Sequence, residues 1–129
     1  SNLTSLRITN TTLPTEVLSA IGALPKLKEL TLSSCGITSI SGLKDATGLV
    51  YLDLNNNTIR NISALSGMTS LETLLMHHNA LNDLTAISNL TALKKVVLPS
   101  TLERIDFGAF YGCSSLKKIS FSRNNLCMI

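Results

Sequence analysis

The sequence predicts an α/β solenoid, in which stacked coils each contribute one short strand and one short helical return segment. Two observations predict it. The spacing L-x-x-L-x-L-x-x-N occurs from Leu49 to Asn57. The same frame starts at each of six leucines, namely Leu3, Leu27, Leu49, Leu71, Leu93 and Leu116. These leucines are separated by 24, 22, 22, 22 and 23 residues. A period in this range is typical of repeat architectures, in which each repeat is one structural unit.

A short strand is predicted at the start of each repeat. In the third repeat, Leu52 and Leu54 alternate with Tyr51 and Asp53, so that leucines point inward and the other two outward. Offsets of three and five residues between the leucines do not share a helical face, which excludes a helix. The strand cores are LTSLRI, LKELTL, LVYLDL, LETLLM, LKKVVL and LKKISF.

A residue that can donate a hydrogen bond follows each strand. The amide of Asn57 can satisfy backbone groups that would otherwise be buried without a partner. The equivalent residues in the six repeats are Thr11, Cys35, Asn57, Asn79, Thr101 and Asn124. We therefore expect a ladder of turn residues along the solenoid.

The return segments predict short helical elements. In the first, from Pro14 to Leu24, the apolar residues Val17, Leu18, Ile21 and Leu24 have helical spacing, and Thr12 or Thr15 is the expected cap. The next three, ITSISGLKDATG, IRNISALSGMTS and LNDLTAISNLTA, have apolar residues three apart. That spacing predicts 3₁₀ turns or very short helices, with Ser41, Ser63 and Thr85 as caps.

The pattern as a whole resembles the leucine-rich repeat, whose units of about 20–29 residues build a horseshoe. The resemblance implies a right-handed solenoid with short parallel strands on the concave face and short helices or 3₁₀ turns on the convex face. The second to fourth repeats resemble the 22-residue class of bacterial internalins. The fifth resembles the BspA-like surface-antigen repeat, through Leu98, Pro99, Leu102, Ile105, Ala109, Phe110, Cys113, Leu116 and Ile119.

We expect a single domain, residues 1–129, of about five complete repeats and a partial sixth, and we expect it to be a piece of a longer chain. The net charge of +3 is too small to indicate binding to nucleic acid or a membrane surface. No apolar run reaches the length that spans a bilayer. Cys35 and Cys113, about three coils apart, are expected to be buried free thiols.

The outward-facing strand residues form the candidate binding surface, because strand alternation directs them away from the core. We select as partner-binding residues Arg7, Glu29, Tyr51, Asp53, Leu75, His77, Lys95, Val97 and Lys118. Among them Tyr51, Leu75 and Val97 are expected to be exposed. An aromatic residue beside aliphatic residues and an acid can form a small hot spot for a protein partner.

We find no catalytic motif in the sequence, and we expect no enzyme activity, no cofactor and no metal. His77 and His78 could bind a metal or sense pH. Adjacent residues near the end of a strand are, however, expected to diverge, and no third ligand is evident. The default interpretation is a pair of solvated polar residues on the rim of the concave face.

The resemblance to internalins and BspA-like antigens implies a bacterial cell-surface or secreted module that binds a protein, or a glycan, on its concave face. The alternative is a structural or regulatory scaffold within a larger protein, with no ligand of its own. A third interpretation is an intracellular regulatory subunit, since 22-residue repeats also resemble a eukaryotic phosphatase-regulator family. Terminal coils with one uncovered face also predict either end-to-end self-association or fraying of the sixth unit.

Overall fold

The computed structural model describes residues 1–81, 83–99, 102, 104–105, 107–121 and 127–128. Its main feature is a parallel sheet with the strand order β1-β2-β3-β4-β5-β7. The strands are β1 (Ser5–Arg7), β2 (Glu29–Thr31), β3 (Tyr51–Asp53), β4 (Thr73–Leu75), β5 (Lys95–Leu98) and β7 (Lys118–Phe121). Each pairs with the strand one repeat away, so that Leu52 lies between Leu30 and Leu74. All six lie where the repeat pattern predicts them.

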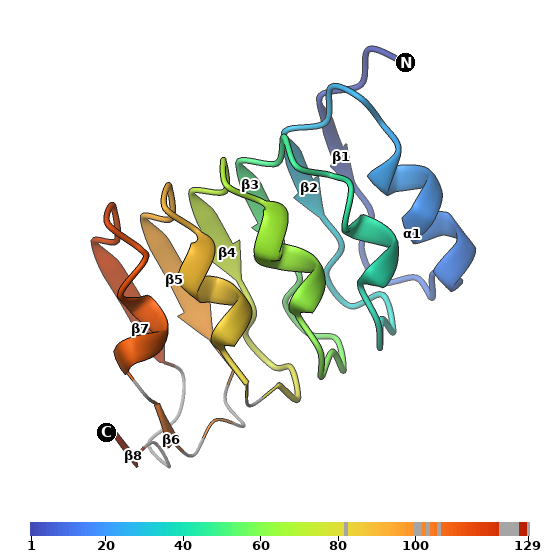
Figure 1. Cartoon of the computed structure of the whole chain (residues 1–129). Helices are drawn as coiled ribbons and strands as arrows, with labels where there is room; N and C mark the ends of the chain where they lie inside the picture. The colour runs from blue at the N-terminus through green and yellow to red at the C-terminus, as the bar shows by residue number, and fades with distance from the viewer. Residues whose placement is uncertain (82, 100–101, 103, 106, 122–126, 129) are drawn as a thin grey trace.

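The return segments lie on the opposite side of the coils from the sheet (Figure 1). They contain the helix α1 (Thr15–Gly22) and the 3₁₀ helices η1 (Ser41–Leu43), η2 (Ser63–Gly67), η3 (Thr85–Asn89) and η4 (Phe107–Phe110). The first return segment thus forms the predicted short helix, and the next three form the predicted 3₁₀ turns. The predicted fold, a solenoid with strands on one face and helical elements on the other, is confirmed.

The capping residues predicted for α1 are wrong. Its N-cap is Pro14, and no side chain caps it by a hydrogen bond. Thr15 is already the first helical residue, where its hydroxyl is bonded to the side chain of Glu16 at 3.3 Å. Pro14 has no N–H of its own and an extended backbone, which suits the start of a helix without side-chain help.

The caps predicted for the 3₁₀ helices are also wrong, by a regular offset. Ser41, Ser63 and Thr85 are the first helical residues, and their backbone N–H groups are the donors. The acceptors are the side chains of Ser39, Asn61 and Asp83, at 3.3, 2.8 and 2.9 Å respectively. In each of the three helices, the N-cap residue lies between the acceptor residue and the donor residue. These N-cap residues are Ile40, Ile62 and Leu84, and all three are buried. Because the core needs an apolar residue there, the polar cap lies one residue earlier.

Repeated aliphatic side chains build the core. The central strand leucines Leu30, Leu52 and Leu74 have no exposed area. The apolar residues three apart in the second to fourth return segments are all buried; they are Ile37, Ile40, Leu43, Ala46, Ile59, Ile62, Leu65, Met68, Leu81, Leu84, Ile87 and Leu90. Each coil therefore has buried apolar side chains on both its strand and its return segment. Both sets pack against the neighbouring coils.

Two glycines allow α1 to pack closely against η1. A Cβ atom on Gly42 would lie 2.8 Å from the backbone nitrogen of Ser19 in α1. A Cβ atom on Gly22 would meet the carbonyl oxygen of Gly42. Any side chain at either position would therefore push the longer first return segment away from the second coil.

A second, two-stranded parallel sheet was not predicted. It pairs β6 (Arg104–Ile105) with β8 (Cys127–Met128), in the register Arg104 to Cys127. The offset of 23 residues equals the step from Leu93 to Leu116, so this sheet is another column of the same repeat. Strands of two residues are too short to show an alternating pattern, which is why the sequence did not indicate them.

Candidate recognition surface

Buried asparagines fix the end of the strands. The Oδ1 atom of Asn57 accepts hydrogen bonds from the backbone N–H groups of Cys35 and Ile37, at 3.0 and 3.1 Å. Its Nδ2 atom donates to the carbonyl oxygens of Leu32 and Leu54, at 2.9 and 3.0 Å. One side chain thus joins the second and third coils and satisfies backbone groups of both.

Asn79 repeats this arrangement one coil later. Its Oδ1 atom accepts from the N–H of Ile59 at 3.1 Å, and its Nδ2 atom donates to the carbonyls of Leu54 and Met76. The predicted ladder is confirmed at these two rungs. Thr101 and Asn124, the equivalent residues of the last two repeats, lie outside the described residues.

Cys35 forms a weaker rung. Its Sγ atom lies 3.3 Å from the carbonyl oxygen of Ile8 and 3.4 Å from that of Ser33, to which the thiol can donate. Burial raises the pKa of this thiol, and the backbone N–H of Thr11 opposes that rise. The thiol therefore stays protonated and acts as a donor. Cys35 and Cys113 are both buried and free, as the sequence predicted.

A column of left-handed residues, missed by the sequence analysis, precedes the turn ladder. The φ angles are 58° at Asn10, 57° at Ser34, 59° at Asn56 and 55° at His78. Each residue stands directly before a turn residue of the ladder. Asparagine and histidine are enriched in this conformation, so Asn10, Asn56 and His78 carried a usable signal, whereas Ser34 did not.

This conformation explains a wrong prediction about the two histidines. The rings of His77 and His78 do not diverge; their centroids lie 3.7 Å apart with an angle of 54° between the planes. His78 is exposed and His77 is half-buried, with its backbone N–H donating to Oδ1 of Asn55 at 2.7 Å. His78 is left-handed, so the alternation of a regular strand, on which the prediction rested, does not apply at this pair.

The sheet places the outward-facing strand residues in two rows, which together form the concave face. The first row is Ser5, Glu29, Tyr51, Thr73, Lys95 and Lys118. The second is Arg7, Thr31, Asp53, Leu75, Val97 and Ser120. Eight of the nine selected residues lie in these rows, and His77 lies at the rim, two residues beyond Leu75.

The concave face is less open than predicted. Tyr51, Leu75 and Val97 are half-buried rather than exposed, while Arg7 and Lys118 are exposed. Neighbouring strands of a sheet lie only about 4.8 Å apart, so side chains in one row cover each other's flanks. The apolar side chains of this face therefore present their ends to solvent and not their full length.

Charged groups surround Tyr51. Burial is the largest cause that raises the pKa of its phenol, and the negative charge of Asp53 comes second. Glu29 acts in the same direction, while the positive charge of Arg7 lowers this pKa. The carboxylate of Asp53 is itself held in place, because its Oδ1 atom accepts from the N–H of Asn55 at 3.0 Å. The first three coils thus carry a mixed, mainly acidic group of side chains around one aromatic ring.

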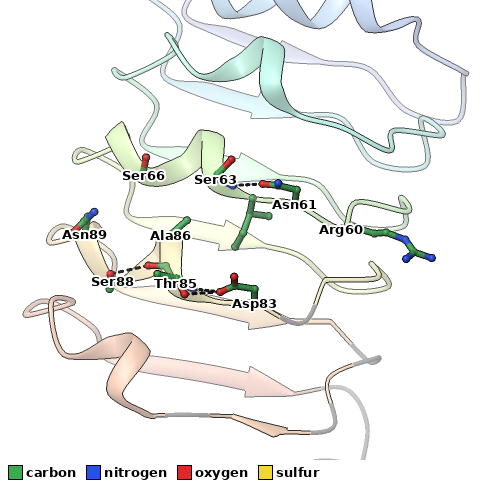
Figure 2. A pocket seen from close by; sticks show the side chains of 10 residues that line it. Arg60, Asn61, Ser63, Ser66, Asp83, Thr85, Ala86, Ser88 and Asn89 are labelled. Carbon is green, nitrogen blue, oxygen red and sulfur yellow. Dashed lines mark hydrogen bonds between the residues drawn. The ribbon is translucent and has the colours of Figure 1, made fainter.

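A groove of about 450 Å³ on the other side of the solenoid is the competing candidate (Figure 2). It lies between η2 and η3. Asn61 and Ser63 line one side of it, and Asp83, Thr85 and Ser88 line the other. Oδ1 of Asp83 accepts from both the N–H and the hydroxyl of Thr85, at 2.9 and 2.6 Å, and Ser88 Oγ donates to the Thr85 carbonyl at 2.7 Å. Because these polar groups serve the helical turns themselves, the concave face is the stronger candidate.

Within the described residues, no group of three or more His, Cys, Asp or Glu side chains is arranged to hold a metal ion. Across the same residues, none of the helices has the length and apolar character needed to cross a bilayer.

Two family models match the sequence. The model described as Leucine Rich repeats (2 copies) matches residues 25–67 and 47–89. The model described as BspA type Leucine rich repeat region (6 copies) matches residues 84–127. The change between repeat classes therefore falls at the fourth and fifth repeats, where the sequence pattern changes. No match to the sequence was found among curated proteins.

Solved structures from Listeria monocytogenes share the fold. The internalin InlF superposes with a TM-score of 0.86 at 24% identity, over 96% of this chain and 35% of that protein. The functional domain of InlJ, which includes a cysteine ladder, gives a TM-score of 0.73 at 22% identity, over 93% of this chain and 25% of that one. Internalin C2 gives 0.63 at 24% identity, over 94% and 72% respectively. This chain thus spans about a third and a quarter of the first two.

Proposed function

Since this chain belongs to the leucine-rich repeat family, we propose that it is a non-enzymatic recognition module that binds a protein ligand on its concave face. One observation carries the proposal. The inward strand positions repeat nearly the same residue from coil to coil, as Leu30, Leu52 and Leu74 do. The outward positions in register with them differ between these coils, as Glu29, Tyr51 and Thr73 do. Packing explains the uniform set, and recognition of a shaped ligand explains the varied set.

A protein ligand fits this face better than a glycan. Sugar rings commonly need aromatic side chains on which to pack. The two rows of the concave face together contain one aromatic residue, the half-buried Tyr51. Leu75 and Val97 offer apolar contact, with charged side chains to either side. This combination of a small apolar centre and a polar surround is the usual composition of protein interfaces.

The proposal includes a place at the surface of a bacterial cell or outside it. The match of residues 84–127 to the BspA type repeat supports this location, as does the likeness to internalins. An antibody raised against this chain should label intact, unpermeabilised cells of the source bacterium or detect the protein in the culture medium. Labelling that requires permeabilised cells would contradict the proposed location. It would say nothing about the proposed ligand surface.

Selection from a random twelve-residue peptide library tests the ligand surface, because the selected peptides usually bind at the energetic hot spots of a recognition surface. Peptides that bind the wild-type chain should lose roughly tenfold or more in affinity for Leu75→Asp, which places a charge at the apolar centre. Ser66→Asp, which adds the same charge beside the groove between η2 and η3, is the matched control and should bind normally. Circular dichroism would establish that both variants are folded. The reverse pattern, sensitivity to Ser66→Asp alone, would assign binding to the groove.

A further inference from the structure

Charge is divided along the concave face. Over the first three coils the rows contain Arg7, Glu29 and Asp53, with Tyr51 held in their combined field. Over β4 they contain the uncharged Thr73 and Leu75. Over β5 and β7 the charged residues are Lys95 and Lys118, and no acidic residue lies in either row there. Glu29 and Asp53 thus form an acidic segment over β2 and β3, with Arg7 beside it on β1, and the uncharged β4 separates it from the basic segment over β5 and β7.

The two lysines are direct neighbours. Lys95 pairs with Lys118 in the register of β5 and β7, so like charges stand opposite each other on adjacent parallel strands. Such pairs destabilise a sheet. Lys94 and Lys117, the residues just before them, are also positive, as is Lys28 at the same place before Glu29. Lys94 forms an ion pair with Glu72 at 3.2 Å. The cost of this arrangement is relieved when an anionic group binds there.

An apolar pair adjoins the lysines. Leu75 and Val97 are in register on β4 and β5, and both are half-buried on the same face. Val97 is two residues from Lys95 on the same strand, so their side chains point to the same side. A ligand that lies along β5 on this face can therefore contact Lys95 and Val97 together.

We propose that the ligand is a protein segment that presents carboxylates to Lys95 and Lys118 and an apolar side chain to Leu75 and Val97. Its basic residues would face Glu29 and Asp53 over β2 and β3. This inference rests on the proposed function, since it names the partner of the same face. It sets the direction of the partner: the acidic end lies over β7 and the basic end over β2.

Uniform polyanions fit this face less well than such a segment does. A nucleic acid or a sulfated glycan that ran along the face would meet Glu29 and Asp53 after it left the lysines, and like charges repel. No aromatic side chain stands in either row over β5 and β7 for a base or a sugar ring to stack on. A mixed protein segment satisfies both ends at once.

The peptide library again provides the test, now through the chemistry of what it selects. Enriched peptides should combine Asp or Glu with an apolar residue. Lys95→Glu/Lys118→Glu should weaken their binding roughly tenfold or more, since each exposed ion pair contributes up to about a factor of five and reversal adds repulsion. Lys26→Glu/Lys44→Glu has the same charge change at exposed sites away from the concave face, and it should bind within about twofold of wild type. Binding should also weaken as salt is raised from about 50 to 500 mM.

Two results would overturn the inference. One is that the enriched peptides lack acidic residues, or that they bind the Lys95→Glu/Lys118→Glu variant as tightly as wild type. The other is heparin binding at the affinity of the peptides with the same dependence on the two lysines, which would assign the basic end to a polyanion. In both cases a loss of binding in Leu75→Asp would still support the concave face as the ligand surface. Peptides that are indifferent to Leu75→Asp would instead contradict the proposed function itself.

Discussion

The middle coils and the end coils follow one sequence pattern but bury it to different extents. Leu52 and Leu54 in the third coil have no exposed area, whereas Leu6 and Ile8, their equivalents in the first coil, are half-buried. Ile119, the equivalent of Leu52 in the last coil, is also half-buried. β3 lies between two strands, while β1 and β7 are the ends of the sheet order. The stability of a repeat therefore comes from its neighbours more than from its own sequence.

The largest effect expected from this difference is in hydrogen exchange. The amides of Tyr51 and Lys118 make the same bond in their coils, to the carbonyls of Lys28 and Lys94, at 3.1 and 3.0 Å. If coverage by neighbours decides protection, the free energy of opening should be at least about 3 kcal/mol lower at Lys118 than at Tyr51. Native-state exchange measured by NMR or mass spectrometry would give both values.

Light scattering across a range of concentrations is the companion measurement. Apolar end coils predict end-to-end self-association, and association would raise the protection of Lys118 as concentration rises. A monomer with equal protection at both amides would contradict the contrast between middle and end coils.

Truncation of equivalent leucines should show the next largest effect. Leu52→Ala removes a fully buried side chain and should lower the free energy of unfolding by about 2–5 kcal/mol. Leu6→Ala removes a half-buried one and should cost about 1 kcal/mol. Denaturant unfolding of both variants would test the ratio. Equal losses would mean that the first coil is covered as well as the third.

Loss of a ladder residue should have a smaller effect, again larger in the middle. Asn57→Ala removes the partner of the N–H groups of Cys35 and Ile37 and of the Leu32 carbonyl, which should cost about 1–3 kcal/mol, while the Leu54 carbonyl keeps its bond from Asn79. Thr11→Ala changes the exposed equivalent in the first coil and should cost less than about 0.5 kcal/mol. Midpoints of urea unfolding would compare the two. A midpoint for Asn57→Ala equal to that of wild type would remove the ladder from the account of stability.

The sequence predicted the parts of the fold that repeat. Leu30, Leu52 and Leu74 share a phase because each coil must pack on the next, so one repeat carried the interpretation of all the others. The parts that it did not predict depend on single-residue conformation. The left-handed φ angle of Ser34 is not one that serine favours, and the shift of the caps to Ser39, Asn61 and Asp83 follows from an apolar N-cap that only the structure revealed.

For the candidate surface, alternation alone predicted which residues face outward, and the register of the strands confirmed that they share one face. Exposure was overestimated at Tyr51, Leu75 and Val97, because sequence alternation gives the direction of a side chain but not the cover from the next strand. The adjacency of Lys95 and Lys118 follows from the repeat, because each lies two residues after the first leucine of its repeat, and the register confirms it.

The smallest effect expected concerns two middle coils that differ by one charge. Asp83 and Asn61 hold the same place before a 3₁₀ helix, and each accepts a bond from the N–H two residues later. Bonds from the hydroxyl and N–H of Thr85 lower the pKa of Asp83 below its ordinary value of 3.8. A carboxyl group with a lowered pKa stabilises the folded chain above its unfolded pKa, and that stabilisation is lost as the pH falls through the folded pKa.

Asp83→Asn should therefore lower Tm at pH 7 by less than about 3 °C, because the carboxylate is exposed and solvent screens its charge. The difference from wild type should disappear as the pH falls below the pKa of Asp83 in the folded chain, where the carboxyl group is neutral in both states. Asn61→Asp should show a smaller effect of the opposite sign, since the N–H of Ser63 matches only the second of the two causes that lower the pKa of Asp83. Calorimetric scans between pH 7 and pH 2 would measure both. A Tm difference that does not change with pH would mean that shape alone, without charge, fixes the start of these turns.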